Sequence, residues 1–206
     1  MSRFLRVIVL LGVLVGGATA AVQDDRPKVE LLTDFTDAAL NDRWAARNDD
    51  VMGGRSEGNL SIDADEGVLT MSGAINLNGG GFTSVMMDVA GAGDIDFTGV
   101  RGIRFRVRTD REPSRPYRLR VEDDVARDRG LNFRGLMTLS VAPPADEWQD
   151  VTVWLQHLRP TFQGRELDPA DWPPLDPSRI RSLGIILNDT AAGPYELQVQ
   201  RIELIR

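Results

Sequence analysis

The sequence predicts an all-β sandwich, and three observations support that fold class. Short segments alternate apolar and polar residues with the period of two that is typical of half-buried strands. Glycine, proline and aspartate separate these segments at intervals of roughly 8–20 residues, as in two-sheet proteins. Only residues 37–44 and 168–180 could form short helices. With 206 residues, the chain is long enough for one domain with a substantial core.

The alternation predicts about ten strands, of which 101–108 is the clearest. In this segment Ile103, Phe105 and Val107 face one side, so we expect them to be buried. Leu119 and Val121 follow the same rule further along the chain. The expected strands are 29–34, 59–63, 67–73, 82–89, 101–108, 117–122, 132–140, 149–155, 182–188 and 196–205.

Arginines occupy the polar side of two successive strands. Arg104, Arg106 and Arg108 lie in the first of these strands, and Arg118 and Arg120 lie in the second. We expect all five to share one face. An exposed face of this kind would be a solvated outer surface, whereas on a concave face the guanidinium groups could bind an acidic or hydroxyl-rich ligand. The sequence leaves both interpretations open.

The N-terminus has the pattern of an export signal. Arg3 and Arg6 precede an apolar stretch at 7–15, and Ala18-Thr19-Ala20 has the small residues of a cleavage site. The apolar stretch is too short to cross a bilayer, which takes about 20 residues. We therefore expect export to the periplasm or beyond, with no membrane span after cleavage. The expected divisions are a signal peptide at 1–20, a flexible N-terminal segment at 21–28 and a single β-sandwich domain at 29–206.

Composition excludes several classes of function. The chain has 31 acidic and 24 basic residues, for a net charge of −7. Such a balance disfavours nucleic-acid partners and anionic membrane surfaces. The absence of cysteine excludes disulfides and thiol catalysis. One histidine and no cysteine also argue against zinc and copper sites, so we expect no metal and no cofactor.

Catalytic chemistry has little support in the sequence. His157 is the only histidine, and no G-x-S-x-G segment accompanies it, so we expect it at the surface near the end of a strand. Aspartates are paired at 49–50, 63 and 65, 94 and 96, and 123–124. None of these pairs has the spacing of an EF-hand, and closely spaced aspartates are typical of turns. We therefore expect a protein that is not an enzyme.

The most distinctive stretch of the chain is Asn48-Asp49-Asp50-Val51-Met52-Gly53-Gly54-Arg55-Ser56. Adjacent glycines disfavour both helices and strands and are typical of tight loops with close backbone approach. Asn and Asp side chains often bond to nearby backbone groups in such loops. The stretch is therefore either a structural turn or a wall of a binding site with Met52 as an apolar plug. Turn chemistry alone explains every residue in it.

A proline-rich connection stands out near the C-terminal end. Residues 158–178 contain five prolines together with Phe162 and Trp172, and they show little periodicity. Connections of this length are usually functional or disordered. One interpretation is a packed cover over a sheet edge. The other is a rim of a ligand surface beside the 48–56 loop.

Several segments resemble one known family. The 48–56 stretch resembles the signature of the complex I intermediate-associated proteins, which are thirty-kilodalton NADH:ubiquinone oxidoreductase assembly factors, and of their bacterial relatives. Further segments resemble that family in the same order over nearly all of the chain after about residue 30. These further segments are Gly79-Gly80-Gly81-Phe82-Thr83-Ser84, Gly102-Ile103-Arg104-Phe105-Arg106-Val107, Tyr117-Arg118-Leu119, Pro160-Thr161-Phe162-Gln163-Gly164-Arg165, Ile180-Arg181-Ser182-Leu183-Gly184 and Ala192-Gly193-Pro194-Tyr195.

The resemblance implies a jelly-roll sandwich of the galactose-binding type and a chaperone-like role in protein-complex assembly, here in an exported bacterial member. A protein partner is then expected. The sandwich class alone favours a different function, a carbohydrate-binding or small-ligand-binding module of the cell envelope with a glycan partner. We expect three glycine-containing loops to meet on one side of the sandwich and form the site. The predicted site residues are Asn48, Asp49, Met52, Gly53, Gly54, Ser56, Gly80, Phe82, Ser84, Phe162 and Arg165.

Overall fold

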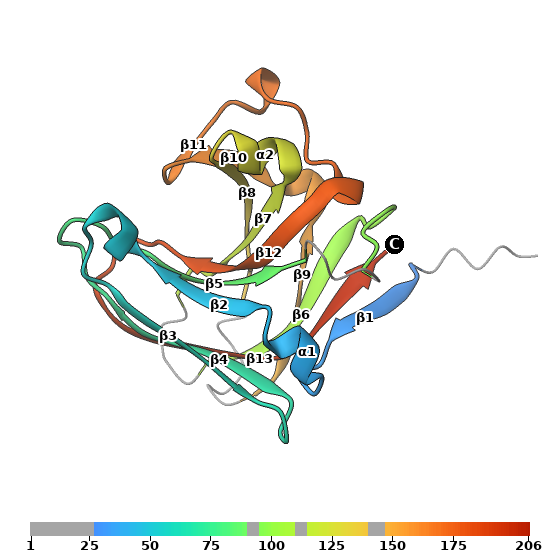
Figure 1. The fold of residues 1–206 in the computed structure, drawn as a ribbon, viewed down its shortest axis with the longest axis horizontal. Coiled ribbons are helices and arrows are strands. Elements are labelled where there is room, and N and C mark those ends of the chain that lie inside the picture. Colours follow the sequence, from blue (N-terminus) through green and yellow to red (C-terminus); the bar gives the residue numbers. More distant parts are fainter. Residues whose placement is uncertain (1–26, 90–94, 110–114, 140–146) are drawn as a thin grey trace, which may run out of the picture.

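The computed structural model is an all-β jelly-roll sandwich of two sheets, which confirms the predicted fold class (Figure 1). It describes residues 27–89, 95–109, 115–139 and 147–206. The expected signal peptide lies outside the described residues, as does most of the expected N-terminal segment. In the described ranges, no helix is both long and apolar enough to span a bilayer.

The first sheet has six strands in the order β3-β4-β13-β6-β9, and β1 also pairs with β13. All pairings are antiparallel. The strands of this sheet are β1 (Val29–Thr33), β3 (Glu57–Asp63), β4 (Val68–Ile75), β6 (Gly102–Arg108), β9 (Gln149–Trp154) and β13 (Gly193–Ile205).

The second sheet has seven strands in the order β11-β10-β8-β7-β12-β5-β2, again all antiparallel. Its two edges are therefore β2 and β11. The strands are β2 (Trp44–Asn48), β5 (Thr83–Asp88), β7 (Arg118–Asp123), β8 (Leu131–Leu136), β10 (Arg159–Phe162), β11 (Arg165–Glu166) and β12 (Ile180–Leu187).

Helices are short and lie at the connections. Asp37 and Asp123 each cap an α-helix by accepting a bond from a backbone N–H in its first turn. The helices are α1 (Ala38–Asn41) and α2 (Asp124–Asp128), with 3-10 turns η1 (Asp49–Met52), η2 (Leu155–His157), η3 (Pro169–Asp171) and η4 (Pro177–Arg179).

The core lies between the two sheets and follows the predicted alternation. Ile103, Phe105 and Val107 of β6 are fully buried, as are Leu119 and Val121 of β7. Period-two burial of this kind stabilises both sheets by removing one apolar face of each from water. The prediction for these five residues is confirmed.

The expected single arginine face is wrong. Strand β6 pairs with β13 and β9 in the six-stranded sheet, whereas β7 pairs with β8 and β12 in the other sheet. The two sets of arginines therefore lie on opposite outer sides of the sandwich. Alternation shows which side of a strand faces the core, but it does not show to which sheet the strand belongs.

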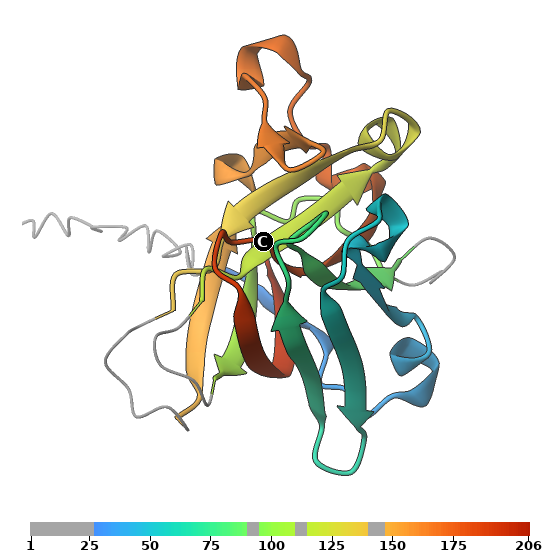
Figure 2. The same ribbon diagram turned by 90° about the vertical axis from the view of Figure 1, so that its left-hand side faces the viewer.

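The proline-rich connection forms one edge of the seven-stranded sheet. It supplies β10 and β11, and Leu167, Trp172 and Leu175 then pack against the core. The Arg129 guanidinium also lies 5.5 Å from the centre of the Trp172 ring. Figure 2 shows this segment in orange at the top of the molecule, away from η1. It is a packed cover over a sheet edge, and the alternative position beside the 48–56 loop is wrong.

Candidate functional site

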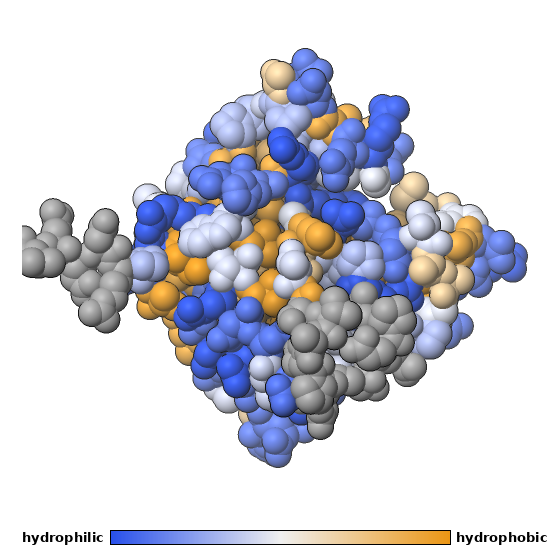
Figure 3. Space-filling model, turned by 180° about the vertical axis from the view of Figure 1, so that it is seen from behind, coloured by the Kyte–Doolittle hydropathy of each residue, from blue (hydrophilic) through white to orange (hydrophobic). Residues whose placement is uncertain are grey.

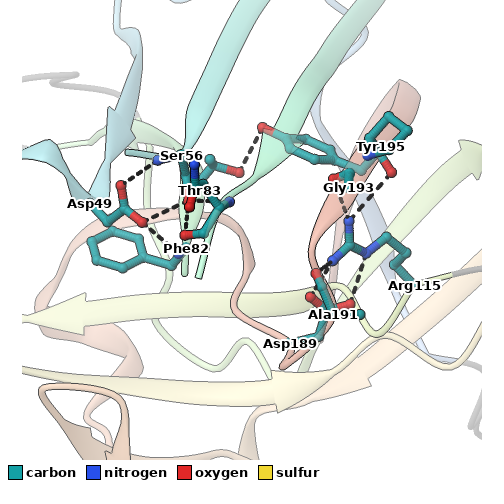
Figure 4. A network of polar contacts seen from close by, with 11 residues as sticks. Asp49, Ser56, Phe82, Thr83, Arg115, Asp189, Ala191, Gly193 and Tyr195 are labelled. Atoms are coloured by element: carbon teal, nitrogen blue, oxygen red, sulfur yellow. Dashed lines mark hydrogen bonds and ion pairs between the residues drawn. The ribbon is translucent and has the colours of Figure 1, made fainter. Parts of the chain in front are cut away.

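The 48–56 loop is organised around the buried carboxylate of Asp49. One of its oxygens accepts from the Ser56 N–H at 2.9 Å. The other accepts from the Ser56 hydroxyl at 2.7 Å, the Gly81 N–H at 2.6 Å and the Phe82 N–H at 3.3 Å. Asp49 therefore ties the η1 loop to the chain before β5, with every bond directed inward (Figure 4).

The glycines of this region leave the space that Asp49 occupies. A Cβ at Gly54 would lie 2.2 Å from the Asp49 Cγ, and a Cβ at Gly80 would lie 2.3 Å from its Oδ2. Gly53 has a φ of +83°, which ends the 3-10 turn in the left-handed conformation that favours glycine. The glycines of both sequence motifs are thus explained by local packing.

Further hydrogen bonds near this loop join the second sheet to the first. Next to Phe82, the Thr83 hydroxyl donates to the Tyr195 hydroxyl oxygen at 2.6 Å, which joins β5 to β13. Arg115 holds the start of β13 by donating to the Gly193 carbonyl at 2.9 Å and forms an ion pair with Asp189 (Figure 4). This is the arrangement of a structural lock, since the Asp49 and Arg115 charges are satisfied inside the protein, although the buried Asn48 Oδ1 of the same loop has no hydrogen-bond partner.

The pKa of Asp49 reflects this environment. Burial acts to raise the pKa, but the hydrogen bonds from Ser56, Gly81 and Phe82 outweigh burial, and the net result is a pKa below the ordinary value. Asp49 is therefore charged at neutral pH and held by dipoles, which suits an anchor and not a proton donor.

Apolar side chains project from the tip of this loop. Val51 is 78% exposed and Met52 is 61% exposed, and Leu77 is also exposed on the neighbouring connection. Figure 3 shows these apolar atoms at the right-hand tip of the view from behind. Met52 therefore points outward, and the expectation that it is a plug between polar groups is wrong.

The structure brings most of the predicted site residues together, but not all of them. Those of the 48–56 loop and the 80–84 segment meet through the Asp49 bonds and the pairing of β2 with β5. Phe162 and Arg165 lie on β10 and β11, at the opposite edge of the same sheet. The expectation that all three loops converge is wrong. The residues that do meet are Asn48, Asp49, Met52, Gly53, Gly54, Ser56, Gly80, Phe82 and Ser84.

A second candidate surface is the outer side of the seven-stranded sheet. Met86 and Ile186 leave the sheet on this side, since their neighbours Val85, Met87 and Ile185 belong to the core. They are nevertheless only 3% and 1% exposed.

Four arginines lie on this side of the sheet, and together they define what we call the arginine face. Arg120 of β7 lies directly opposite Arg134 of β8, and Arg134 lies directly opposite Arg159 of β10. Arg118 is two residues before Arg120 on the same side of β7. Neighbouring strands are about 4.8 Å apart, and like charges directly opposite one another are destabilising.

The acidic side chains on the same side of this sheet are Glu122, Asp88 and Glu166. Arg120 forms an ion pair with Glu122 at 2.7 Å, and the Ser182 hydroxyl donates to the other Glu122 oxygen at 3.0 Å. The Nε of Arg120 is buried with no hydrogen-bond partner. Within the part of the chain that the structure describes, no acidic side chain forms an ion pair with Arg118, Arg134 or Arg159.

The pKa of Arg134 records this crowding. Burial, followed by the charges of Arg120 and Arg118, lowers the pKa of Arg134 to about 10. The Arg134 Nε donates to the Asn132 side-chain oxygen at 2.6 Å, which is a neutral partner. The charges of Glu122 and Glu166 act in the opposite direction but do not outweigh burial and the two arginines, and the guanidinium remains charged at neutral pH.

The arginines of the six-stranded sheet are arranged differently. Arg104 donates to Glu203 at 2.7 Å, and Arg106 donates to Gln200 at 3.0 Å and lies 3.7 Å from Asp150. Arg108 donates to Gln198 at 2.5 Å, and its guanidinium lies 4.6 Å from the centre of the Trp148 ring. These arginines alternate with acceptors on β13 and β9 and form an ordinary solvated outer face.

The remaining polar residues have structural or surface positions. His157 is exposed in η2 beside Gln156. Asp123 caps α2, and Asp63 accepts from backbone N–H groups within its own turn. Asp94 lies outside the described residues. Among those that are described, no three His, Cys, Asp or Glu side chains are grouped so that they could hold a metal ion.

The sequence signalled only part of the arginine face. The alternation of β7 placed Arg118 and Arg120 on one side, but Arg134 and Arg159 come from strands whose pairing partners the sequence does not reveal. A cue was present in Asn132-Phe133-Arg134, where one apolar residue separates two polar ones. That cue predicts an outward Arg134, but not a position opposite Arg120.

Solved structures with a similar fold include carbohydrate-binding modules and about a quarter of an agarase chain. A family 11 carbohydrate-binding module of a cellulosomal cellulase from Clostridium thermocellum is 16% identical with a TM-score of 0.58, over 86% of this chain and 94% of that one. The family 11 module from the same organism in complex with a β-1,3-1,4-mixed-linked tetrasaccharide is 14% identical, with a TM-score of 0.56 over 87% and 96%. An agarase is 15% identical with a TM-score of 0.50, over 84% of this chain and 26% of that one.

At these identities the likeness concerns the fold alone. No curated protein matches the chain. The family described as complex I intermediate-associated protein 30 matches residues 33–199, which include the Asp49 loop and most strands of both sheets. Because the match spans most of the sequence, this chain belongs to the complex I intermediate-associated protein 30 family.

Proposed function

We propose that this protein is a non-catalytic binding module that holds a partner protein on its arginine face. The observation that supports this most directly is the group of four guanidinium groups with one ion-paired carboxylate, on the surface of a protein with net charge −7. Crowded like charges reduce stability, so their presence is best explained by a ligand that compensates them.

A protein partner agrees with the chemistry next to these arginines. Leu136 is 48% exposed and lies directly opposite Arg118 in the β7–β8 ladder. Arginine beside an exposed apolar side chain is a common composition for the central part of a protein interface. The family name, which refers to association with an intermediate of complex I, supports an assembly or chaperone-like role of the same general kind.

A second candidate is a carbohydrate-binding or small-ligand-binding module. It is favoured by hydroxyl groups on the same face, since Ser84 and Ser182 lie beside the arginines on β5 and β12. Sugar rings usually stack on flat aromatic side chains. The outward positions described for β5, β12, β7 and β8 carry none, so we rank the protein partner first.

We also propose that the protein is exported. The proposal depends on the charged, apolar and small-residue pattern of residues 1–20, with residues 29–206 folding as one domain. The partner would then be a protein of the periplasm or the extracellular space. N-terminal sequencing of the native protein should begin at Ala21, and a chain that still carries Met1 would contradict export.

Site-specific photocrosslinking tests the docking face. We would place benzoylphenylalanine at Leu136, on the arginine face, and in a second protein at Trp154, which is 39% exposed on the outer side of the six-stranded sheet. In the native cell envelope, irradiation should join a partner protein to position 136 only. Equal crosslinking from both positions, or none from position 136, would contradict the proposed docking face.

A further inference from the structure

The geometry of the arginine face points to one class of partner: we infer that the docked protein presents a run of carboxylate side chains to Arg120, Arg134 and Arg159. This inference rests on the proposed function and specifies the chemistry of the same site. Its basis is the position, burial and pairing of the three guanidinium groups.

The three arginines form a straight row across three strands. They occupy directly opposed positions on β7, β8 and β10 and extend from one side of the sheet. With neighbouring strands about 4.8 Å apart, the row spans roughly 10 Å. One small anion cannot contact all three guanidinium groups, so a ligand that compensates the whole row needs several negative groups joined together.

The row uses only part of its donors within the protein: Arg134 donates to the Asn132 side-chain oxygen, and Arg120 donates to Glu122. The Arg120 Nε has no hydrogen-bond partner although it is buried, and a buried donor without a partner lowers stability. Arg159 is exposed, and no ion pair to it is found among the residues that the structure describes. An approaching carboxylate could accept two parallel hydrogen bonds from a guanidinium group, which is the strongest pairing available to arginine.

Glu122 shows the kind of group that the row accepts. Its carboxylate is mostly buried, accepts from Arg120 on one oxygen and accepts from Ser182 on the other. It forms an ion pair with one end of the row, whereas Arg134 is acted on by Glu122 and Glu166 without a direct ion pair among the described residues. A carboxylate-rich segment that lies across strands β8 and β10 would pair with Arg134 and Arg159 as Glu122 pairs with Arg120.

The net charge of the protein limits where an acidic partner can dock. A protein of net charge −7 repels acidic partners at long range, so the attraction must come from a local reversal of sign. Only contacts within about a Debye length, roughly 10 Å at 0.1 M salt, then contribute to binding. Docking is therefore confined to the arginine face and weakens as the salt concentration rises.

Fluorescence anisotropy with defined peptides tests the inference. We would titrate the folded protein into fluorescein-labelled hexaglutamate and, as the matched neutral probe, hexaglutamine. Hexaglutamate should bind more tightly, and its affinity should fall as NaCl rises from about 50 to about 500 mM. Equal binding of the two peptides would overturn the inference.

Variants locate the binding to the row. Arg134→Ala and Arg159→Ala should each weaken hexaglutamate binding by about tenfold, because each removes a charge-assisted contact. Arg159 is exposed, so its variant retains the fold even if the Arg134 variant does not. Arg106→Ala, on the opposite sheet, is the matched control and should bind like the wild type. An equal loss in this control would overturn the inference.

A competition experiment distinguishes an acidic protein from an acidic glycan. It also tests the carboxylate inference separately from the proposed docking face. Excess hexaglutamate should block crosslinking from position 136, whereas trigalacturonate, which carries its carboxylates on sugars, should compete less well. Better competition by trigalacturonate would replace the acidic protein with an acidic glycan. Persistent crosslinking from position 136 in excess hexaglutamate would overturn the carboxylate inference alone and leave the docking face intact.

Discussion

The Asp49 loop and the arginine face handle buried charge in opposite ways. In the loop, one carboxylate accepts four hydrogen bonds, and the nearby glycines leave the room that it requires. On the face, Arg134 has two arginines opposite it and only the neutral Asn132 as a partner. Satisfied charge is typical of a structural lock, whereas crowded like charge is the basis on which we propose that a partner binds at the arginine face.

The largest expected effect is on the lock. Asp49→Ala should lower the free energy of unfolding by about 3 kcal/mol, because it leaves the Ser56, Gly81 and Phe82 donors without an acceptor. Urea unfolding at neutral pH measures this. The exposed neighbour Asp50→Ala is the control and should change stability by less than about 0.5 kcal/mol. Equal effects of the two changes would erase the distinction between lock and site.

A second prediction concerns the glycines of the lock. Gly54→Ala should cost about 2 kcal/mol, because the new methyl group would displace the Asp49 carboxylate. Gly53→Ala, where a Cβ meets nothing within 4 Å, should cost only about 1 kcal/mol from its positive φ. Thermal unfolding of both variants gives the order. A reversed order would show that backbone conformation, and not the room for Asp49, explains the two glycines.

The lock should also be sensitive to acid. The pKa of Asp49 is lower in the folded protein than in the unfolded chain, so its contribution to stability is fully present above the unfolded pKa, near 4. That contribution is lost as the pH falls from about 4 through the lower folded pKa. In Asp49→Asn this loss is absent, and other carboxyls titrate alike in both proteins. The urea midpoints of the wild type and of Asp49→Asn, measured between about pH 5 and pH 3, should therefore converge as the pH falls.

Sequence reasoning gave the fold class and the core because period-two burial is a local property. Phe105 and Leu119 are buried, as the apolar–polar alternation within their own strands predicts. The residue types of the 48–56 loop predict a tight turn, but its role depends on bonds from Gly81 and Phe82, which come from another part of the chain. The pattern of residue types could not show that Asp49 points inward while Met52 points outward.

The candidate site needed long-range information of a different kind. The position of Arg120 opposite Arg134, and of Arg134 opposite Arg159, depends on strand order, since β10 pairs with β8 after a crossing between sheets. Strand order is decided by the packing of the whole sandwich. The sequence therefore led us to group Arg118 and Arg120 with β6, whose arginines are paired on the far side of the molecule.

The smallest expected effect on stability concerns the arginine face. Arg134→Met keeps an unbranched side chain of similar length, removes a charge that burial and two arginines disfavour, and leaves no carboxylate unpaired. We expect it to leave the free energy of unfolding unchanged or to raise it by up to about 1 kcal/mol. Arg104→Met, by contrast, leaves Glu203 without its closest partner and should lower stability. Urea unfolding of both variants at neutral pH gives the comparison. If Arg134→Met destabilised the protein as much as Arg104→Met, the arginine face would be a structural element, and its unpaired charge would no longer indicate a ligand.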